Sequence, residues 1–138
     1  MIISVDPSNG LAIYDQIVRQ IKFAIASEAV LPGELVPSVR ELSKKVAVNP
    51  NTVARAYREL QSDGVLESVR GTGLQVTKKA PKQCQSDRVS LIRERLRQVL
   101  KEAQLSQLEA DEIRQLTESE LSQLNGRSAA GTAQGESA

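Results

Sequence analysis

Two pairs of polar residues stand where the chain is expected to begin short helices. Asn51 and Thr52 follow Pro50 at the start of one helical stretch, and Ser38 and Arg40 open the stretch before it. Asparagine can pair bidentately with adenine, threonine can meet a thymine methyl group, and arginine can hold a phosphate or a guanine. The free N–H groups of a helix start also attract phosphate. These residues suit nucleic acid, although Asn and Thr also favour helix starts for local reasons and Arg40 could be a solvated charge.

More basic residues accompany these pairs. Arg55 and Arg58 are expected on the outer side of the helix that Asn51 leads. Arg70, Gly71 and Thr72 lie in a later turn, RGTG, and arginine at a flexible tip suits the negative potential of a minor groove. The glycines could equally serve only to form the turn. Three lysines farther on either attract phosphate or are simply solvated: Lys78, Lys79 and Lys82.

The charge of the chain is unevenly distributed. The net charge is only +1, which by itself does not indicate a nucleic-acid partner. Residues 37–82 carry nine basic and four acidic groups, giving +5, whereas residues 1–36 and residues 83–138 each have a net charge of −2. A basic middle between mildly acidic ends indicates one face for an anionic polymer.

Several other classes of protein are not expected. The chain has no histidine and one cysteine, Cys84, so it forms no internal disulfide and a zinc site is implausible. No run of about 18 apolar residues exists, and the first residues lack the pattern of a signal peptide. A cytoplasmic location is therefore expected by default. Cys84 lies in a polar stretch and is interpreted as an incidental thiol, with redox sensing as the alternative.

The elements that must position these residues begin with a helix after the polar stretch PSNG at residues 7–10. Isoleucine recurs every four residues, which predicts one apolar helix face: Ile13, Ile17, Ile21 and Ile25. Asn9 is expected to cap this helix. The helix should end before the turn at Pro32-Gly33.

Two shorter helices are expected next. Ser38 and Glu41 form an S-x-x-E capping box, which predicts a helix of about two turns. Asn49 is a good helix cap and Pro50 suits the first helical position, so a second helix should run from Pro50 to about Ser62. Two short helices joined by a tight turn, the second led by polar donors, are typical of a helix-turn-helix.

The inner face of this last helix is predicted to hold Val53, Ala56, Tyr57 and Leu60. Tyr57 is expected to pack in the core with its hydroxyl at the edge. A direct contact between that hydroxyl and a phosphate is the alternative.

A β-hairpin is predicted around the RGTG turn, because residues 65–69 and 74–76 alternate apolar and polar side chains. A helix, a helix-turn-helix and a hairpin in this order are typical of a winged helix-turn-helix. The expected fold class is therefore mainly α with a small β-hairpin wing, followed by a C-terminal helical region.

The chain after the hairpin has a different character. Residues 79–86 are polar, contain Pro81 and are predicted to be a linker, and residues 126–138 are expected to be disordered. Residues 87–125 are predicted to form either two helices, the second capped by Ser106 and Glu109, or one long bent helix. Their apolar residues are predicted to form a dimer interface: Val89, Ile92, Leu96, Val99, Leu108, Ile113 and Leu116.

The stretch PSVRELSKKVAVNPNTVARAYRELQSDGVLESVRGTGLQV closely resembles the DNA-binding domain of the GntR family of bacterial transcription regulators. With the preceding helix, the resemblance covers about residues 10–78, and the short helical tail resembles the YtrA subfamily, in which two helices replace a ligand domain and make the dimer. The resemblance implies a dimeric repressor on a palindromic operator, often controlling ABC transporter genes. It places DNA contacts at Arg40, Asn51, Thr52 and Gly71, with Arg70 beside the wing glycine.

Three classes of function follow from these observations. The leading prediction is a sequence-specific transcriptional regulator that binds double-stranded DNA as a homodimer and needs no cofactor. The alternative is a winged-helix adaptor that binds proteins without DNA sequence specificity. An enzyme is not expected, because the chain has no Cys/His pair, no nucleotide-cradling glycine loop and no evident carboxylate pocket. Whether a small-molecule effector acts is left open, since the short tail leaves little room for a pocket.

Overall fold

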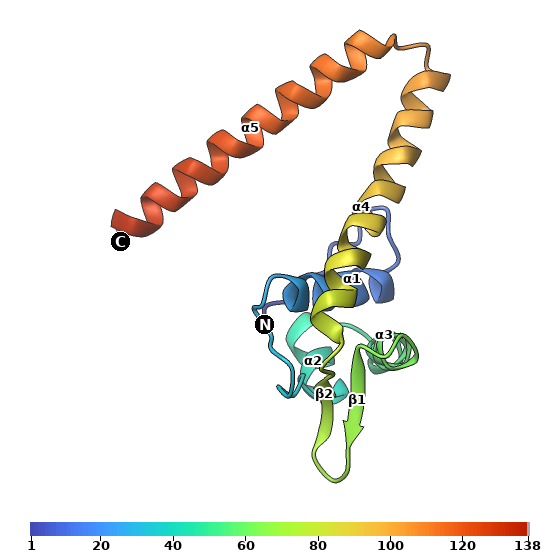
Figure 1. The fold of residues 1–138 in the computed structure, drawn as a ribbon, viewed down its shortest axis with the longest axis vertical. Helices are drawn as coiled ribbons and strands as arrows, with labels where there is room; N and C mark the ends of the chain where they lie inside the picture. The colour runs from blue at the N-terminus through green and yellow to red at the C-terminus, as the bar shows by residue number, and fades with distance from the viewer. Residues whose placement is uncertain (138) are drawn as a thin grey trace. The chain divides into compact units, whose positions relative to one another are not determined.

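The computed structural model describes residues 1–137, with side chains described up to residue 126. The chain divides into two units, Met1–Ile92 and Arg93–Ala138. In the first unit, three helices and the first turns of a fourth surround an aliphatic core, and a two-stranded hairpin lies between the third and fourth helices in the chain (Figure 1). The predicted fold class, mainly α with a β-hairpin wing and C-terminal helices, is confirmed.

Helix α1 (Ile13–Ala26) carries the predicted isoleucine face, and three of its members are fully buried: Ile17, Ile21 and Ile25. The helix begins after Ala12, which supplies no side-chain cap, so the prediction that Asn9 caps it is wrong. At its other end, Glu28 adopts the left-handed conformation with φ of 65°, a conformation that glycine more often supplies.

The segment before α1 explains where that helix begins. The Gln16 side-chain amide donates to the Asp6 carbonyl oxygen at 2.8 Å and accepts from the Asp6 N–H at 2.9 Å. Ile3, in the same segment, is buried in the core. These contacts hold the segment along α1, so the folded unit is wider than the predicted residues 10–78.

Helices α2 (Val39–Val46) and α3 (Pro50–Ser62) start as predicted. The Glu41 N–H donates to the Ser38 hydroxyl oxygen at 3.1 Å, and the Ser38 N–H donates to the Glu41 carboxylate at 3.4 Å. The Asn49 side-chain oxygen accepts from the Asn51 N–H at 2.8 Å, with Pro50 at the first helical position. Local capping chemistry therefore decides where both helices begin.

The inner face of α3 is buried at the four predicted positions, Val53, Ala56, Tyr57 and Leu60. Tyr57 is 2% exposed, and its hydroxyl donates to the Pro37 carbonyl oxygen at 2.7 Å. Its ring thus packs in the core as predicted, while its hydroxyl holds the residue just before the α2 cap.

The wing consists of strands β1 (Leu66–Val69) and β2 (Gly73–Val76), which pair antiparallel. Leu66 lies opposite Val76 at the base, and Val69 lies opposite Gly73 at the tip. Both residues at the base are buried, so the hairpin is anchored in the core and its turn extends from it (Figure 1).

Helix α4 (Ala80–Leu105) replaces the predicted linker at residues 79–86. Ala80 and Cys84 are fully buried in the core of the first unit, which ties this polar stretch to the fold, and Pro81 is tolerated in the first turn of the helix. Burial raises the pKa of the Cys84 thiol to about 11. The interpretation that Cys84 lies in a polar linker is therefore wrong, and the buried neutral thiol is unsuited to redox sensing.

The second unit contains the end of α4 and helix α5 (Ala110–Ser137). Two helices are present rather than one bent helix. The Ser106 hydroxyl donates to the Ala103 carbonyl oxygen at 2.8 Å, and the Glu109 N–H donates to the Glu112 carboxylate at 3.3 Å. The predicted cap by Ser106 and Glu109 is wrong, because α5 starts one residue after Glu109. The disorder predicted for residues 126–138 falls, apart from Gly126, on residues whose side chains are not described, and it stays a prediction.

No helix among the described residues is long and apolar enough to cross a membrane. The same residues contain no cluster of three or more side chains that could hold a metal ion.

Candidate nucleic-acid interface

The start of α3 presents the side chains that the sequence singled out for base contacts. Asn51 is exposed and Thr52 is half-buried. The cap is supplied by the Asn49 side-chain oxygen, which accepts a hydrogen bond from the Asn51 backbone N–H. The Asn51 side-chain amide is therefore not consumed in capping, and its donor and acceptor can meet the edge of a base.

The start of α2 presents a hydroxyl and a guanidinium group. Ser38 is exposed, and because its oxygen accepts from the Glu41 N–H, its own O–H can donate to a phosphate. Arg40 is exposed in the first turn and forms no ion pair among the described residues. Both groups lie where the partial positive charge of the helix start adds to the attraction for an anion.

The two outer arginines of α3 have different surroundings. The Arg55 guanidinium lies over the Tyr14 ring of α1, 3.7 Å from its centroid, in a cation–π contact. Arg58 is exposed. Arg55 is exposed as predicted, but it is held by α1, a contact that the spacing within α3 does not indicate.

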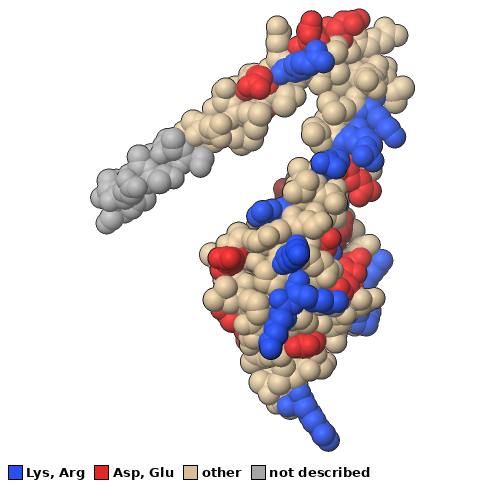
Figure 2. Space-filling view, in the orientation of Figure 1, with Lys and Arg blue, Asp and Glu red and all other residues tan. Residues whose placement is uncertain are grey.

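The tip of the wing carries the exposed residues Arg70, Gly71 and Thr72. Gly71 has φ of 76° and Gly73 has φ of 134°, so the turn itself requires glycine at both positions. The Thr72 N–H closes the turn on the Val69 carbonyl oxygen at 2.9 Å. Figure 2 shows one basic side chain at the end of the hairpin, separated from the other basic groups of that face.

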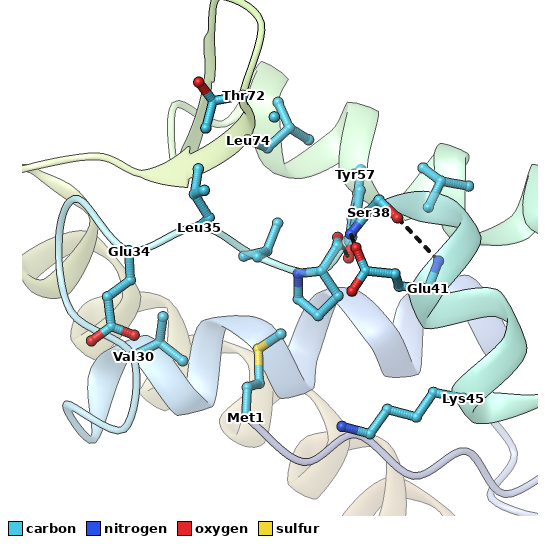
Figure 3. Close-up of a pocket in the computed structure, with 14 residues that line it drawn as sticks. Met1, Val30, Glu34, Leu35, Ser38, Glu41, Lys45, Tyr57, Thr72 and Leu74 are labelled. Carbon is cyan, nitrogen blue, oxygen red and sulfur yellow. Dashed lines mark hydrogen bonds between the residues drawn. The ribbon is translucent and has the colours of Figure 1, made fainter.

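A groove of about 660 Å³ lies between the start of α2 and the wing (Figure 3). Ser38 and Thr72 both line it, as do the carboxylates of Glu34 and Glu41. Two predicted contacts from separate elements, the α2 cap and the wing tip, thus border the same groove.

Of the three lysines after the wing, Lys79 lies near the other end of α3. The Lys79 side chain folds against Gly64, which follows the last turn of α3. The 13 residues of α3 span about 20 Å between that end and Asn51. This position, far from Asn51, favours the solvated interpretation of Lys79 over phosphate contact.

The predicted dimer residues are largely uncovered. In the first unit, Val89 and Ile92 are 53% and 51% exposed. In the second unit, Leu96, Val99 and Leu116 are 49%, 60% and 55% exposed, while Leu108 and Ile113 are half-buried. Three more leucines, none of them among the predicted interface residues, are equally or more exposed: Leu105, Leu121 and Leu124.

Two further contacts were not predictable from local patterns. One is the hydrogen bond between Tyr57 and Pro37 described above. The other is an ion-pair cluster in which Lys22 contacts Asp63 and Asp87, residues 41 and 65 positions away in the chain. The periodicity of apolar residues indicates which residues share a face of one helix or strand, so it cannot predict contacts between residues this far apart in the chain.

Comparison with known proteins agrees with this arrangement. Residues 13–76 match the model described as "Bacterial regulatory proteins, gntR family". The chain is 34% identical over 111 residues to the HTH-type transcriptional repressor YtrA of Bacillus subtilis, covering 80% of this chain and 85% of that protein.

Two solved structures are also similar. A GntR family transcriptional regulator from Listeria monocytogenes has a TM-score of 0.62 and 31% identity, covering 81% of this chain and 97% of that one. The DNA-binding domain of AraR in complex with operator ORX1 has a TM-score of 0.50 and 28% identity, covering 54% of this chain and 94% of that one. The winged helix, its exposed polar helix starts and these similarities agree: the chain belongs to the gntR family of bacterial regulatory proteins, whose members are transcription regulators and not enzymes.

Proposed function

We propose that this chain is a dimeric, sequence-specific repressor that binds a palindromic operator in double-stranded DNA. The observation that supports this most directly is the start of α3, where the Asn49 cap leaves the Asn51 side-chain amide exposed. The similarity to YtrA, which is named a repressor, and to AraR, which was solved on an operator, supports the same role.

In this proposal α3 lies in the major groove. Asn51 pairs with a base edge, adenine being its best match, and Thr52 meets a thymine methyl group or a phosphate. Ser38 and Arg40 hold the adjacent backbone, which fixes the register of the helix without reading the sequence. Arg58 adds charge from the exposed side of α3.

The wing reaches the neighbouring minor groove. Arg70 enters it, because a narrow minor groove concentrates negative potential, and Thr72 stays beside it. The positive φ of Gly71 gives the tip a conformation that a larger residue would strain.

The apolar residues of α4 and α5 join two copies. Their side chains are about half exposed in one chain, and covering them with a second copy removes apolar surface from water. A two-fold dimer matches a palindrome, with half-sites separated by about 34–36 Å or a multiple of this distance. Such a repressor works in the cytoplasm, where DNA is found, and control of ABC transporter genes remains the implication of the resemblance to the family.

The test begins with selection of fragments from genomic DNA by the full chain, followed by measurement of binding to the selected operator and to random duplexes. Asn51→Ala should weaken binding to the operator by about 1–3 kcal/mol but change binding to random duplexes little, so that the preference for the operator sequence is reduced. Ser38→Gly removes a hydroxyl while keeping an acceptable cap, so affinity for every duplex should fall alike.

Gln61→Ala is the matched control, since Gln61 is an exposed amide in the last turn of the same helix and bonds to Ser68. It should leave both affinities unchanged. Equal losses on operator and random DNA for Asn51→Ala would reject the proposed reading by α3. The absence of any shift of duplex DNA at low salt would instead support the protein-interaction adaptor.

A further inference from the structure

The buried side chain of Lys22, on α1, is at the centre of a junction between three elements. Its side chain is 9% exposed, and its ammonium group lies 3.0 Å from a carboxylate oxygen of Asp63 and 3.0 Å from one of Asp87. Asp63 caps the end of α3, and Asp87 lies in the third turn of α4. One ammonium group therefore connects the helix proposed to read DNA with the helix proposed to join two copies.

The electrostatics favour a persistent contact. Burial acts to lower the pKa of Lys22, but hydrogen bonds and charges from Asp63 and Asp87 outweigh that effect and raise the pKa above its ordinary value. Lys22 is thus a cation throughout the physiological range. The two carboxylates are only partly exposed, at 38% and 32%, so water screens the contact less than it screens a surface pair.

Other contacts hold the same side of α4. Ala80, Cys84 and Asp87 follow i, i+4, i+7 spacing and so share one helix face, and the first two are fully buried. The Gln83 side chain donates to the Asp63 carbonyl oxygen at 2.9 Å. The first turns of α4 are therefore held by an apolar face buried in the core of the first unit and, at the end of α3, by the contacts that Gln83 and Lys22 make with Asp63.

The direction of α4 matters because the helix is continuous from the junction to Leu105, so a tilt at the junction is amplified along its length. From Asp87 to Leu105 the helix rises about 27 Å, so a tilt of about 10° at the junction displaces its end by about 5 Å. One added base pair shifts a half-site by only about 3.4 Å and rotates it by about 35°. A tilt of about 10° at the junction therefore moves the end of α4 by at least the distance that one added base pair moves a half-site.

We propose that Lys22, with Asp63 and Asp87, is a positioning residue that sets the half-site spacing at which the dimer binds. The three residues touch no DNA. They act by holding the angle between α3 and the first turns of α4, and this inference rests on the dimeric, DNA-reading function proposed above.

The experiment measures binding to a single half-site and to a series of duplexes whose two half-sites differ in separation by one base pair at a time. The wild-type chain should bind best at one spacing and about tenfold more weakly one or two base pairs away. Asp87→Ala and Lys22→Met should flatten this preference to within about threefold, because a looser junction lets the dimer adapt. Both variants should bind the single half-site within about twofold of the wild type.

Lys82→Met is the control, because Lys82 is an exposed cation in the first turn of α4 and lies outside the junction. It should keep the wild-type spacing profile. An unchanged profile in Asp87→Ala and Lys22→Met would overturn the inference, and so would loss of single half-site binding, which would mean that the cluster serves the fold alone. A wild-type chain that binds DNA without any spacing preference would overturn the proposed dimeric function as well.

Discussion

Removing the Tyr57 hydroxyl tests how the start of α2 is held. Tyr57→Phe deletes the hydrogen bond to the Pro37 carbonyl oxygen, a short bond of 2.7 Å at a residue that is 2% exposed. Burial, together with the charge of Glu41, raises the pKa of Tyr57, so the hydroxyl is a protonated donor at all working pH values. Pro37 is only half-buried, and water can partly satisfy its carbonyl once the donor is gone.

The expected loss is therefore about 1–1.5 kcal/mol in the free energy of unfolding. For a cooperative unit the size of Met1–Ile92, this corresponds to a decrease of roughly 4–10 °C in Tm. Pro37 precedes the Ser38 cap, so the phosphate contact proposed for Ser38 should loosen. Affinity for all duplexes should then fall by about two- to threefold, without a change in base preference.

Urea and thermal unfolding measure the first effect, and DNA titration measures the second. Tyr14→Phe is the control, since Tyr14 contacts Arg55 through its ring, which phenylalanine keeps. It should leave Tm nearly unchanged. If Tyr57→Phe kept wild-type stability but bound every duplex more weakly, the hydroxyl would be contacting a phosphate, and the structural role argued here would be refuted.

Three other changes have defined outcomes. Ser38→Ala should lower the free energy of unfolding by about 1 kcal/mol through loss of the α2 cap, whereas Ser38→Gly should cost only a few tenths; equal losses would contradict capping as the cause. The Cys84 thiol stays neutral in the folded chain at pH values where it already ionises in the unfolded chain, so the free energy of unfolding of the wild type should fall as pH rises from about 9 to about 11. This decline should be shallower in Cys84→Ala. Parallel stability curves for the two proteins would argue against the raised pKa. Leu96→Glu is present twice in a dimer and should raise the dissociation constant roughly 30- to 1000-fold by sedimentation, while an unchanged dimer would remove Leu96 from the interface.

The parts of the fold that sequence could predict are those decided by neighbouring residues. The capping box of Ser38 and Glu41 and the cap by Asn49 with Pro50 involve groups two or three positions apart, so their chemistry can be read directly. The hairpin follows for the same reason, because alternation and a glycine turn are local features.

The parts that were missed depend on groups far apart in the chain. Polar residues 79–86 resemble a linker until Ala80 and Cys84 are found to fill a space in the core of the first unit. The start of α1 depends on hydrogen bonds from Gln16 back to Asp6, ten positions earlier, which no capping rule includes. The residues of the candidate site lie at helix starts and in a turn, which are local features, so their places in the fold could be predicted; their contacts with DNA stay a prediction.

The contact between Arg55 and Tyr14 has an optical consequence. The chain has no tryptophan and only two tyrosines, and one of these, Tyr57, is buried with its hydroxyl bonded. Emission from Tyr14 should therefore respond to any DNA binding that changes the position of the guanidinium group above it. The protein carries its own fluorophore at the edge of α3, and titration with duplex DNA can be followed on the unlabelled chain.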